Sequence, residues 1–256
     1  MTASIPVTSY AQRHNDSLAR PPADLRHLFA SPVRHQGPRP LCVPFSIAAA
    51  HEATRVRMGE PGAEMLTVEP LWQHCLDNGH AGHSGTTLTA GGEAVHAKGQ
   101  TAEAWWPYNA TLGAGTEPEP AAATQAAWYT AATIDTPLAH DGIEDLIEDA
   151  LAVGLPLVLV IELTKQFEEP TADGEIALPA LTAPVGEYHA VLALGAATST
   201  DGTSRRLLIR NTWGSGWGAG GYGWLPLDYL IAFAVQVATI DPTSLAATPT
   251  GARVGP

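Results

Sequence analysis

The pattern of apolar residues changes half-way along the chain, and this change constrains the fold more than any other feature. Three helical stretches, each closed by a glycine, stand in the first half: residues 42–58, 68–77 and 88–98. Four runs with the composition of strands stand in the second half: residues 155–163, 188–195, 205–213 and 235–240. Helices grouped before strands predict an α+β fold.

Length and composition agree with an enzyme of ordinary size. The chain has 256 residues, of which 45% are hydrophobic, so it can bury a full core. Its net charge of -13 argues against nucleic acid and against anionic membrane surfaces as partners. No run of about 18 apolar residues predicts a transmembrane helix, and the N-terminus lacks the pattern of a secretory signal. We therefore expect neither a membrane nor a nucleic acid as partner.

The chain divides into three parts by composition. Residues 1–21 are expected to be an extended N-terminal segment, residues 22–242 the folded domain and residues 243–256 a disordered tail that is poor in apolar side chains. Within the domain, the Ala/Pro/Glu-rich residues 111–125 are expected to form an exposed connector. A further helix is predicted after it, with Asp141 as a candidate N-cap.

Cys42 is the candidate nucleophile. It begins an alanine-rich helical stretch, where the N–H groups of the first turn and the helix dipole favour a negatively charged sulfur. His189, in an apolar strand, and Asn211, at a strand end, supply the residue types needed for a thiol activated by an oriented imidazole. Taken singly, each residue has a plainer interpretation: a small buried thiol, a core histidine and a turn residue.

Several separate blocks around these residues resemble the papain family of cysteine peptidases, especially its bacterial members. The resemblance runs from about residue 22 to residue 242. It rests on motifs in family order: Gln36 six residues before Cys42, Phe45-Ser46, Trp106-Pro107-Tyr108, His189-Ala190-Val191, the signature Asn-Thr-Trp-Gly-Ser-Gly-Trp-Gly at 211–218, and Gly221-Tyr222. The spacing of cysteine, histidine and asparagine is also typical of that family.

The resemblance implies a two-lobed fold, in which a helical lobe, mainly residues 40–110, packs against a β-barrel-like lobe, mainly residues 155–242. The active-site cleft would lie between them. It also implies roles for individual residues: Cys42 as nucleophile, His189 as acid and base, Asn211 as the group that orients the histidine, and Gln36 with the Cys42 backbone N–H as oxyanion donors.

The same resemblance implies a peptide or protein substrate and no cofactor. Residues expected to contact the substrate are Ser84, Gly85, Tyr188, Trp213 and Trp217. Trp213 would also shield the bond between histidine and asparagine from water. The leading function is a thiol protease that hydrolyses peptide bonds through a thioester. Two alternatives stay open: an acyltransferase or amide-forming enzyme in which an amine resolves the thioester, and an inactive papain-like binding protein.

A metal site is the rival interpretation of one histidine-rich stretch. His74, Cys75, His80 and His83 lie within ten residues, but the adjacent His74 and Cys75 point to different faces of a helix, and no second cysteine joins them. We expect no metal here. Cys75 shares a helix face with Leu71 and is expected to be a buried, structural thiol.

The chain departs from the family near the nucleophile. Secreted relatives carry a cysteine three residues before the nucleophile, which forms a disulfide, whereas this position is Arg39 here. With only two cysteines in the chain, a bacterial cytoplasmic protein is expected. Pro40 and Leu41 replace small residues, and Val43 replaces a common tryptophan. No inhibitory prosegment is recognisable before the domain.

Overall fold

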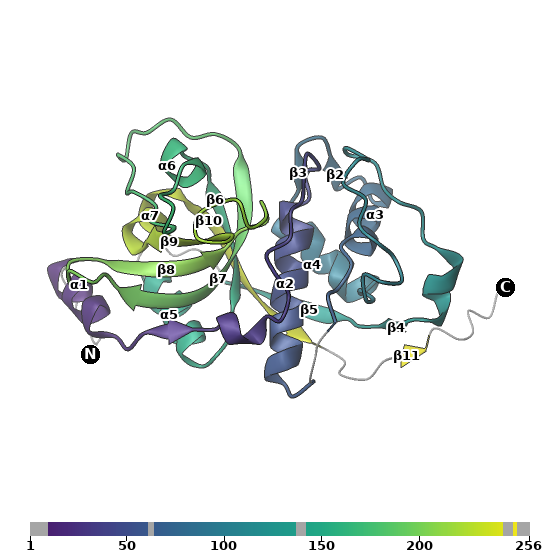
Figure 1. Ribbon diagram of the computed structural model, residues 1–256, viewed down its shortest axis with the longest axis horizontal. Helices are drawn as coiled ribbons and strands as arrows, with labels where there is room; N and C mark the ends of the chain where they lie inside the picture. Colours follow the sequence, from purple (N-terminus) through teal and green to yellow (C-terminus); the bar gives the residue numbers. More distant parts are fainter. Residues whose placement is uncertain (1–9, 61–63, 137–141, 243–247, 250–256) are drawn as a thin grey trace, which may run out of the picture.

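The protein consists of a helical lobe and a lobe built on an antiparallel sheet (Figure 1). The computed structural model describes residues 10–60, 64–136, 142–242 and 248–249. Helix α2, Cys42–Arg57, stands where the two lobes meet (Figure 1). The predicted α+β class is confirmed. Within these ranges no helix is both long enough and apolar enough to cross a membrane.

The helical lobe contains α2 and the short elements that follow it. These are α3 (Glu69–Asp77), the hairpin strands β2 (Ala81–Gly82) and β3 (Gly85–Thr86), and α4 (Leu88–Ala97). All three helices lie within one residue of their predicted bounds. Their stop signals act as expected, because Gly59, Gly79 and Gly99 all have positive φ, which a residue with a Cβ adopts only at a cost. Thr87 caps α4 by accepting a hydrogen bond from the Ala90 N–H at 3.2 Å.

Helix α2 is buried on all sides, and this explains its alanine-rich, weakly amphipathic sequence. One face, with Val43, Ile47 and Ala50, joins the core that also contains the interior of the sheet. Phe45 and Ala48 join a smaller apolar cluster within the helical lobe. Because α2 packs against both lobes, the position of its first residue is determined by both.

The other lobe is built on a single antiparallel sheet. The strands along its main path are β5 (Ala131–Thr136), β10 (Ala234–Pro242), β6 (Leu157–Glu162), β7 (Tyr188–Thr198), β8 (Arg205–Arg210) and β9 (Tyr222–Pro226), in that spatial order. A short N-terminal strand, β1 (Ala23–Asp24), also pairs with β7. Strand β7 lies in the interior of the sheet, where Ile161 of β6 pairs with His189. The central strands are buried over most of their length, as their apolar runs predict.

Shorter elements surround the sheet and the helices. They are α1 (Tyr10–Ala19), the 3₁₀ helices η1 (Arg26–Leu28) and η2 (Ala121–Gln125), β4 (Ala127–Trp128), α5 (Ile143–Ala152), α6 (Lys165–Glu168), α7 (Leu227–Phe233) and β11 (Thr248–Pro249). Helix α1 leads into Arg20, whose guanidinium pairs with Asp145 and Asp149 of α5 at 2.8 and 2.7 Å.

Three expectations about the organisation of the chain need correction. The N-terminal segment is not wholly extended, because α1 occupies residues 10–19 and ends at the ion pairs of Arg20. The connector at 111–125 is not merely an exposed loop, because Gly113 and Gly115 turn their carbonyls inward to a buried arginine. Strand β5 precedes the expected β lobe in sequence but pairs with β10 in the sheet.

Two predictions made from the sequence concern residues that lie largely outside the described ranges. Asp141, the candidate cap of α5, is not described, and the helix begins instead after Gly142, whose φ is +93°. Of the expected disordered tail, only Thr248–Pro249 are described, and they pair with β4.

Candidate active site

Cys42 is the first residue of α2 and is partly exposed. Leu41, at the N-cap, makes no side-chain hydrogen bond to the helix, so its side chain does not cover the N–H groups of the first turn. The backbone N–H groups of Ala190 in β7, of Val43 and of Cys42 itself lower the pKa of the thiol. The influence of Ala190 indicates that the sulfur lies near the strand residue that follows His189.

His189 and Asn211 are joined by a buried hydrogen bond. The distance from His189 Nε2 to Asn211 Oδ1 is 2.7 Å, and neither residue is more than 4% exposed. Asn211 Oδ1 also accepts a hydrogen bond from the Thr212 N–H at 2.8 Å, which identifies this atom as the amide oxygen. Because that oxygen can only accept, Nε2 of the histidine carries the proton. In the neutral imidazole, Nδ1 is therefore free of hydrogen and can accept a proton.

Two aromatic rings contact the histidine, and a third packs against both of them. Trp213 is stacked on His189 at a tilt, with 4.6 Å between ring centroids, and Phe167 of α6 meets the same ring edge-on at 5.8 Å. Trp217 packs against Phe167 and donates its indole N–H to the Phe167 carbonyl at 3.2 Å. These rings exclude water from the bond between His189 and Asn211 and limit rotation of the imidazole.

Burial shifts the pKa of both titrating groups toward the neutral form. It raises the pKa of the Cys42 thiol, whereas backbone N–H groups lower it, and the charge of Glu187 raises it further. Burial also lowers the pKa of His189 to about 4, against a smaller opposite effect from the bond to Asn211. Burial therefore opposes the effect that the helix N–H groups have on the thiol.

Gln36 is held from two sides. Its Nε2 donates to the carbonyl of Arg39 at 2.8 Å, and its Oε1 accepts from the hydroxyl of Thr212 at 2.5 Å. Its backbone N–H donates to the Thr212 carbonyl at 2.8 Å. The segment before Cys42 thus runs beside the segment that carries Asn211, and the amide of Gln36 lies within the same polar cluster.

A small cavity is lined by Asn211. Asn211 Nδ2 and the hydroxyl of Ser46 are both buried, and neither has a hydrogen-bond partner in the described part of the chain. Both residues line a cavity of about 10 Å³, together with Arg34 and Arg210. Space of this order accommodates about one water molecule between polar groups.

The family assignment follows from the sequence profile of these residues together with their fold. The profile described as papain family cysteine protease matches residues 21–229. The chain belongs to the papain family of cysteine proteases. A comparison with curated proteins gave no match.

Solved papain-like structures share the fold. The chain is similar to xylellain, a cysteine protease from Xylella fastidiosa, with a TM-score of 0.70 and 23% identity over 94% of this chain and 95% of that one. It is also similar to digestive procathepsin L 3 from the larval midgut of Tenebrio molitor, with a TM-score of 0.64 and 21% identity over 89% and 72% of the two chains. Identities this low support the shared fold alone.

The residues expected to contact substrate in this papain-family protein lie in different surroundings. Gly85, in the β2–β3 hairpin, approaches the backbone of the nucleophile loop, because a Cβ at its position would stand 3.3 Å from the Pro40 carbonyl oxygen. Ser84 is the exposed turn residue before it. Tyr188 precedes the histidine and is 64% exposed. These three residues are near the candidate site along the chain or in space.

Trp213 and Trp217 differ from the exposed substrate-contacting residues. Trp217 is only 8% exposed and is buried against Phe167, so its contacts are those of a core residue. Trp213 is partly buried and lies over the imidazole. Its observed position fits the shielding role that was expected of it.

The histidine-rich stretch is spread over a helix and a hairpin. Cys75 is fully buried in the core, next to Leu71, as expected of a structural thiol. His80 and His83 are exposed, and His80 lies 3.8 Å from Glu93. In the described ranges, no three histidine, cysteine or acidic side chains come together as a metal site would require.

Two contributors to the site were missed by the motifs. Phe167 comes from a four-residue helix with no family signature, and only its packing on His189 reveals it. Thr212 stands in the signature at 211–218 without a role of its own, yet its hydroxyl donates a hydrogen bond to the side-chain oxygen of Gln36. The signature position of Thr212 was a usable signal, whereas Phe167 had none.

Proposed function

We propose that the protein is a cysteine peptidase that hydrolyses peptide bonds through a thioester on Cys42. The observation that carries this proposal is the buried bond between His189 Nε2 and Asn211 Oδ1. The backbone N–H of the next residue in that strand, Ala190, lowers the pKa of the Cys42 thiol, which supports a position of the sulfur near the histidine strand. This bond leaves the opposite imidazole nitrogen to exchange a proton with the thiol. Membership of the papain family supports the same chemistry.

The first half of the reaction forms the thioester. His189 takes the thiol proton, and the attraction between the resulting imidazolium and thiolate offsets the effect of burial on each group. The sulfur adds to the carbonyl carbon of the scissile bond, and the carbonyl oxygen becomes an oxyanion. The remaining amide hydrogen of Gln36 and the backbone N–H of Cys42 stabilise that oxyanion. His189 then protonates the leaving nitrogen as the C–N bond breaks.

The second half releases the product. His189, now neutral, removes a proton from water, and the hydroxide adds to the thioester carbonyl. The C–S bond breaks, the carboxylic acid leaves and the thiol recovers its proton from His189. Asn211 accepts from Nε2 throughout, so the ring keeps one orientation while its charge changes. Both halves use the same oxyanion donors.

A peptide library with readout by mass spectrometry tests the proposal. The purified protein is incubated with the library, with and without a primary amine, and Cys42→Ala is the control. We expect hydrolysis fragments from the unmodified protein alone, whether or not amine is present. Amine adducts in place of acids would favour acyl transfer. No turnover with any peptide would favour a binding protein and reject the proposal.

A further inference from the structure

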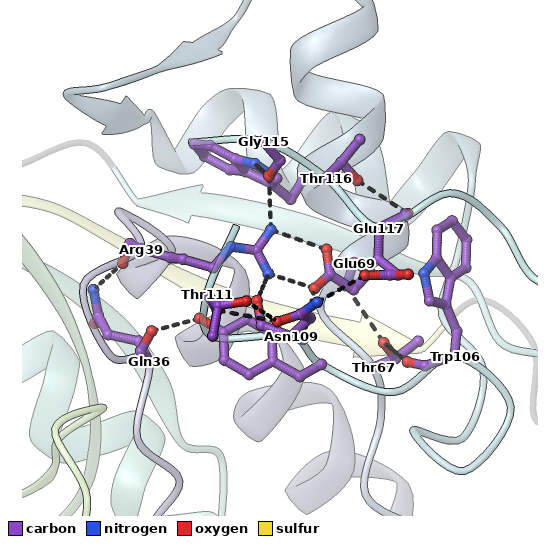
Figure 2. Close-up of polar contacts among 12 residues, drawn as sticks. Gln36, Arg39, Thr67, Glu69, Trp106, Asn109, Thr111, Gly115, Thr116 and Glu117 are labelled. Atoms are coloured by element: carbon purple, nitrogen blue, oxygen red, sulfur yellow. Dashed lines mark hydrogen bonds and ion pairs between the residues drawn. The ribbon is translucent and has the colours of Figure 1, made fainter. Parts of the chain in front are cut away.

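Arg39 lies three residues before the proposed nucleophile and is fully buried. Each of the five N–H groups of its guanidinium donates a hydrogen bond. Nη1 and Nη2 pair with the two carboxylate oxygens of Glu69, which is also 0% exposed. The other three hydrogens are donated to the carbonyls of Asn109 at 2.9 Å, Gly113 at 3.2 Å and Gly115 at 2.8 Å. Figure 2 shows the arginine between the start of α3 and the loop at residues 109–117.

This network joins three segments that are far apart in the sequence. The carboxylate of Glu69 also accepts from the backbone N–H of Asn109 at 3.2 Å, so loop and helix are tied at the same oxygen that meets Arg39. The ring of Tyr108 lies 4.9 Å from the guanidinium carbon. A buried cation with five donors is compatible with the core only when all are satisfied, so the position of Arg39 is specified by the three segments together.

The backbone of Arg39 in turn holds the candidate oxyanion amide. Its carbonyl accepts from Gln36 Nε2 at 2.8 Å and from the Leu41 N–H at 2.9 Å. The ring of Tyr108 lies against the guanidinium, and its hydroxyl donates to the carbonyl of Gln36. Since an amide nitrogen has two hydrogens, fixing one of them on Arg39 determines where the other points. The side chain of Arg39 thereby reaches Gln36 through its own main chain and through Tyr108.

We propose that Arg39, with Glu69 as its counterion, is a positioning residue that aims the free amide hydrogen of Gln36 at the oxyanion. The inference rests on the proposed function, because an oxyanion forms only if Cys42 attacks a carbonyl. Arg39 touches no reacting atom. Its contribution is to prevent the loop at 36–41 from relaxing, so that the donor is in place before the charge develops.

A second buried ion pair in the chain provides a matched control. Arg205 pairs with Glu148, and both side chains are 2% exposed. Its guanidinium also donates to main-chain carbonyls, those of Arg20 at 3.1 Å and Pro21 at 2.9 Å. This pair joins α5 and β8 to the N-terminal segment and makes no hydrogen bond to the candidate site residues. Loss of the ion pair between Arg205 and Glu148 therefore removes a comparable buried interaction but leaves the contacts of Gln36 unchanged.

The test is a double-mutant cycle on turnover. Arg39→Met and the control Arg205→Met are each prepared alone and combined with Gln36→Ala, and kcat and KM for one peptide are measured well below every melting temperature. We expect Arg39→Met to lower kcat about 10- to 100-fold with little change in KM, because a misplaced donor acts on the transition state. In the Gln36→Ala background the same substitution should change kcat by less than about threefold, since the donor that it positions is gone. Arg205→Met should lower the melting temperature and leave kcat within about twofold.

Glu69→Gln is the second variant, in case Arg39→Met does not fold. It keeps the shape of the carboxylate and the carbonyl contacts of Arg39 but leaves the cation without its counterion. We expect a smaller loss of kcat, again dependent on Gln36. Alkylation of Cys42 should proceed at an unchanged rate in both variants, because the thiol and His189 are not involved.

Different outcomes would reject the positioning role of Arg39 and the proposed peptidase function. Equal losses in the native and Gln36→Ala backgrounds, or a loss no larger than that of Arg205→Met, would show that the ion pair of Arg39 is only structural. Full activity in Cys42→Ala would instead reject the proposed function. Unchanged turnover in Gln36→Ala alone would remove the oxyanion role of Gln36, and with it the role of Arg39.

Discussion

Gln36 shows how much of the candidate site depends on single side-chain atoms. Its amide oxygen accepts from Thr212, one of its amide hydrogens is donated to Arg39, and its own carbonyl accepts from Tyr108. A side chain held in this way cannot rotate without breaking a buried hydrogen bond. The remaining hydrogen is therefore preorganised, which is the property that makes an oxyanion donor effective.

Replacing Gln36 with alanine should lower turnover and leave the fold intact. Loss of one oxyanion donor costs about 2.7 to 4 kcal/mol in the transition state, which is about 100- to 1,000-fold in kcat, and because the N–H of Cys42 remains, we expect a loss of this size or smaller. Steady-state kinetics on one peptide, with near-ultraviolet circular dichroism as the check on folding, measures the effect. Turnover equal to that of the native protein would exclude Gln36 from the mechanism.

The two cysteines should differ sharply in their reactivity. Cys42 is partly exposed, and the proposed mechanism gives it His189 as a proton acceptor, whereas Cys75 is fully buried and its pKa is raised by that burial. Iodoacetamide at pH 6 to 7 should therefore label Cys42 and leave Cys75 unmodified. Peptide mapping by mass spectrometry locates the label.

His189→Ala is the informative partner of that experiment. Without an imidazole to take the proton, the thiol stays protonated, and labelling of Cys42 near neutral pH should slow by about tenfold or more and recover only at alkaline pH. Cys75→Ala is the control and should label as the native protein does. Preferential labelling of Cys75 would contradict the assignment of the nucleophile.

At the scale of elements, close packing around α2 determines where its first residue stands. Helix α4 approaches α2 at Gly91, where a Cβ would come within 2.8 Å of Val43, and it approaches β5 at Gly92. Both glycines are buried in the middle of a helix, where glycine is unfavourable by itself. They are explained by contact with the neighbouring elements, because no side chain fits there.

Gly92→Ala should therefore destabilise the protein although it improves helix propensity. A Cβ at this position would stand 2.2 Å from Thr133 Oγ1 and 2.8 Å from Thr133 Cγ2. Overpacking of this kind costs about 1 to 3 kcal/mol, against a propensity gain of about 1 kcal/mol. Urea denaturation measures the free energy of unfolding.

The companion variant Gly92→Ala with Thr133→Ala removes both of the closest atoms. It should recover part of the stability lost in Gly92→Ala, measured relative to Thr133→Ala alone. An increase in stability for Gly92→Ala by itself would mean that helix propensity outweighs the contact between α4 and β5, and would contradict the packing argument.

At the scale of the whole molecule, buried histidines link stability to pH. His51, inside α2, contacts Gln100 through Nδ1 at 3.0 Å and is 0% exposed, and burial lowers its pKa to about 4. Burial lowers the pKa of His189 to the same value. In the unfolded chain both would titrate near 6.5. Between pH 6.5 and 4 the unfolded state therefore binds more protons, and stability falls as the pH is lowered through this window.

The variant His51→Gln should lose part of this acid sensitivity. A shift from 6.5 to about 4 corresponds to about 3 kcal/mol of destabilisation at pH 4 and below, and to none above pH 6.5. The difference in unfolding free energy between pH 7 and pH 4 should therefore be smaller in His51→Gln than in the native protein. His96→Gln, at an exposed position, should keep the native difference. An unchanged difference in His51→Gln would contradict the assignment of a buried neutral imidazole.

Local patterns determined much of what could be predicted. The ends of α2, α3 and α4 were predicted to within one residue, because apolar spacing and a glycine at positive φ act between chain neighbours. The strands β6 to β8 followed from their buried apolar runs. The candidate site residues were predicted from separate motifs that resemble the papain family, because each motif keeps its residue types within a few neighbouring positions.

Contacts between distant segments were decided only by the tertiary structure. Nothing near Arg39 in the sequence indicates Glu69 thirty positions later as its partner, or the carbonyls of a low-complexity connector as its acceptors. The packing of Phe167 on His189 and the insertion of β10 between β5 and β6 are of the same kind. The physical reason is that a buried charge needs hydrogen-bond partners and a buried ring needs packing partners, and the fold brings these from distant segments. No periodicity along the chain identifies such partners.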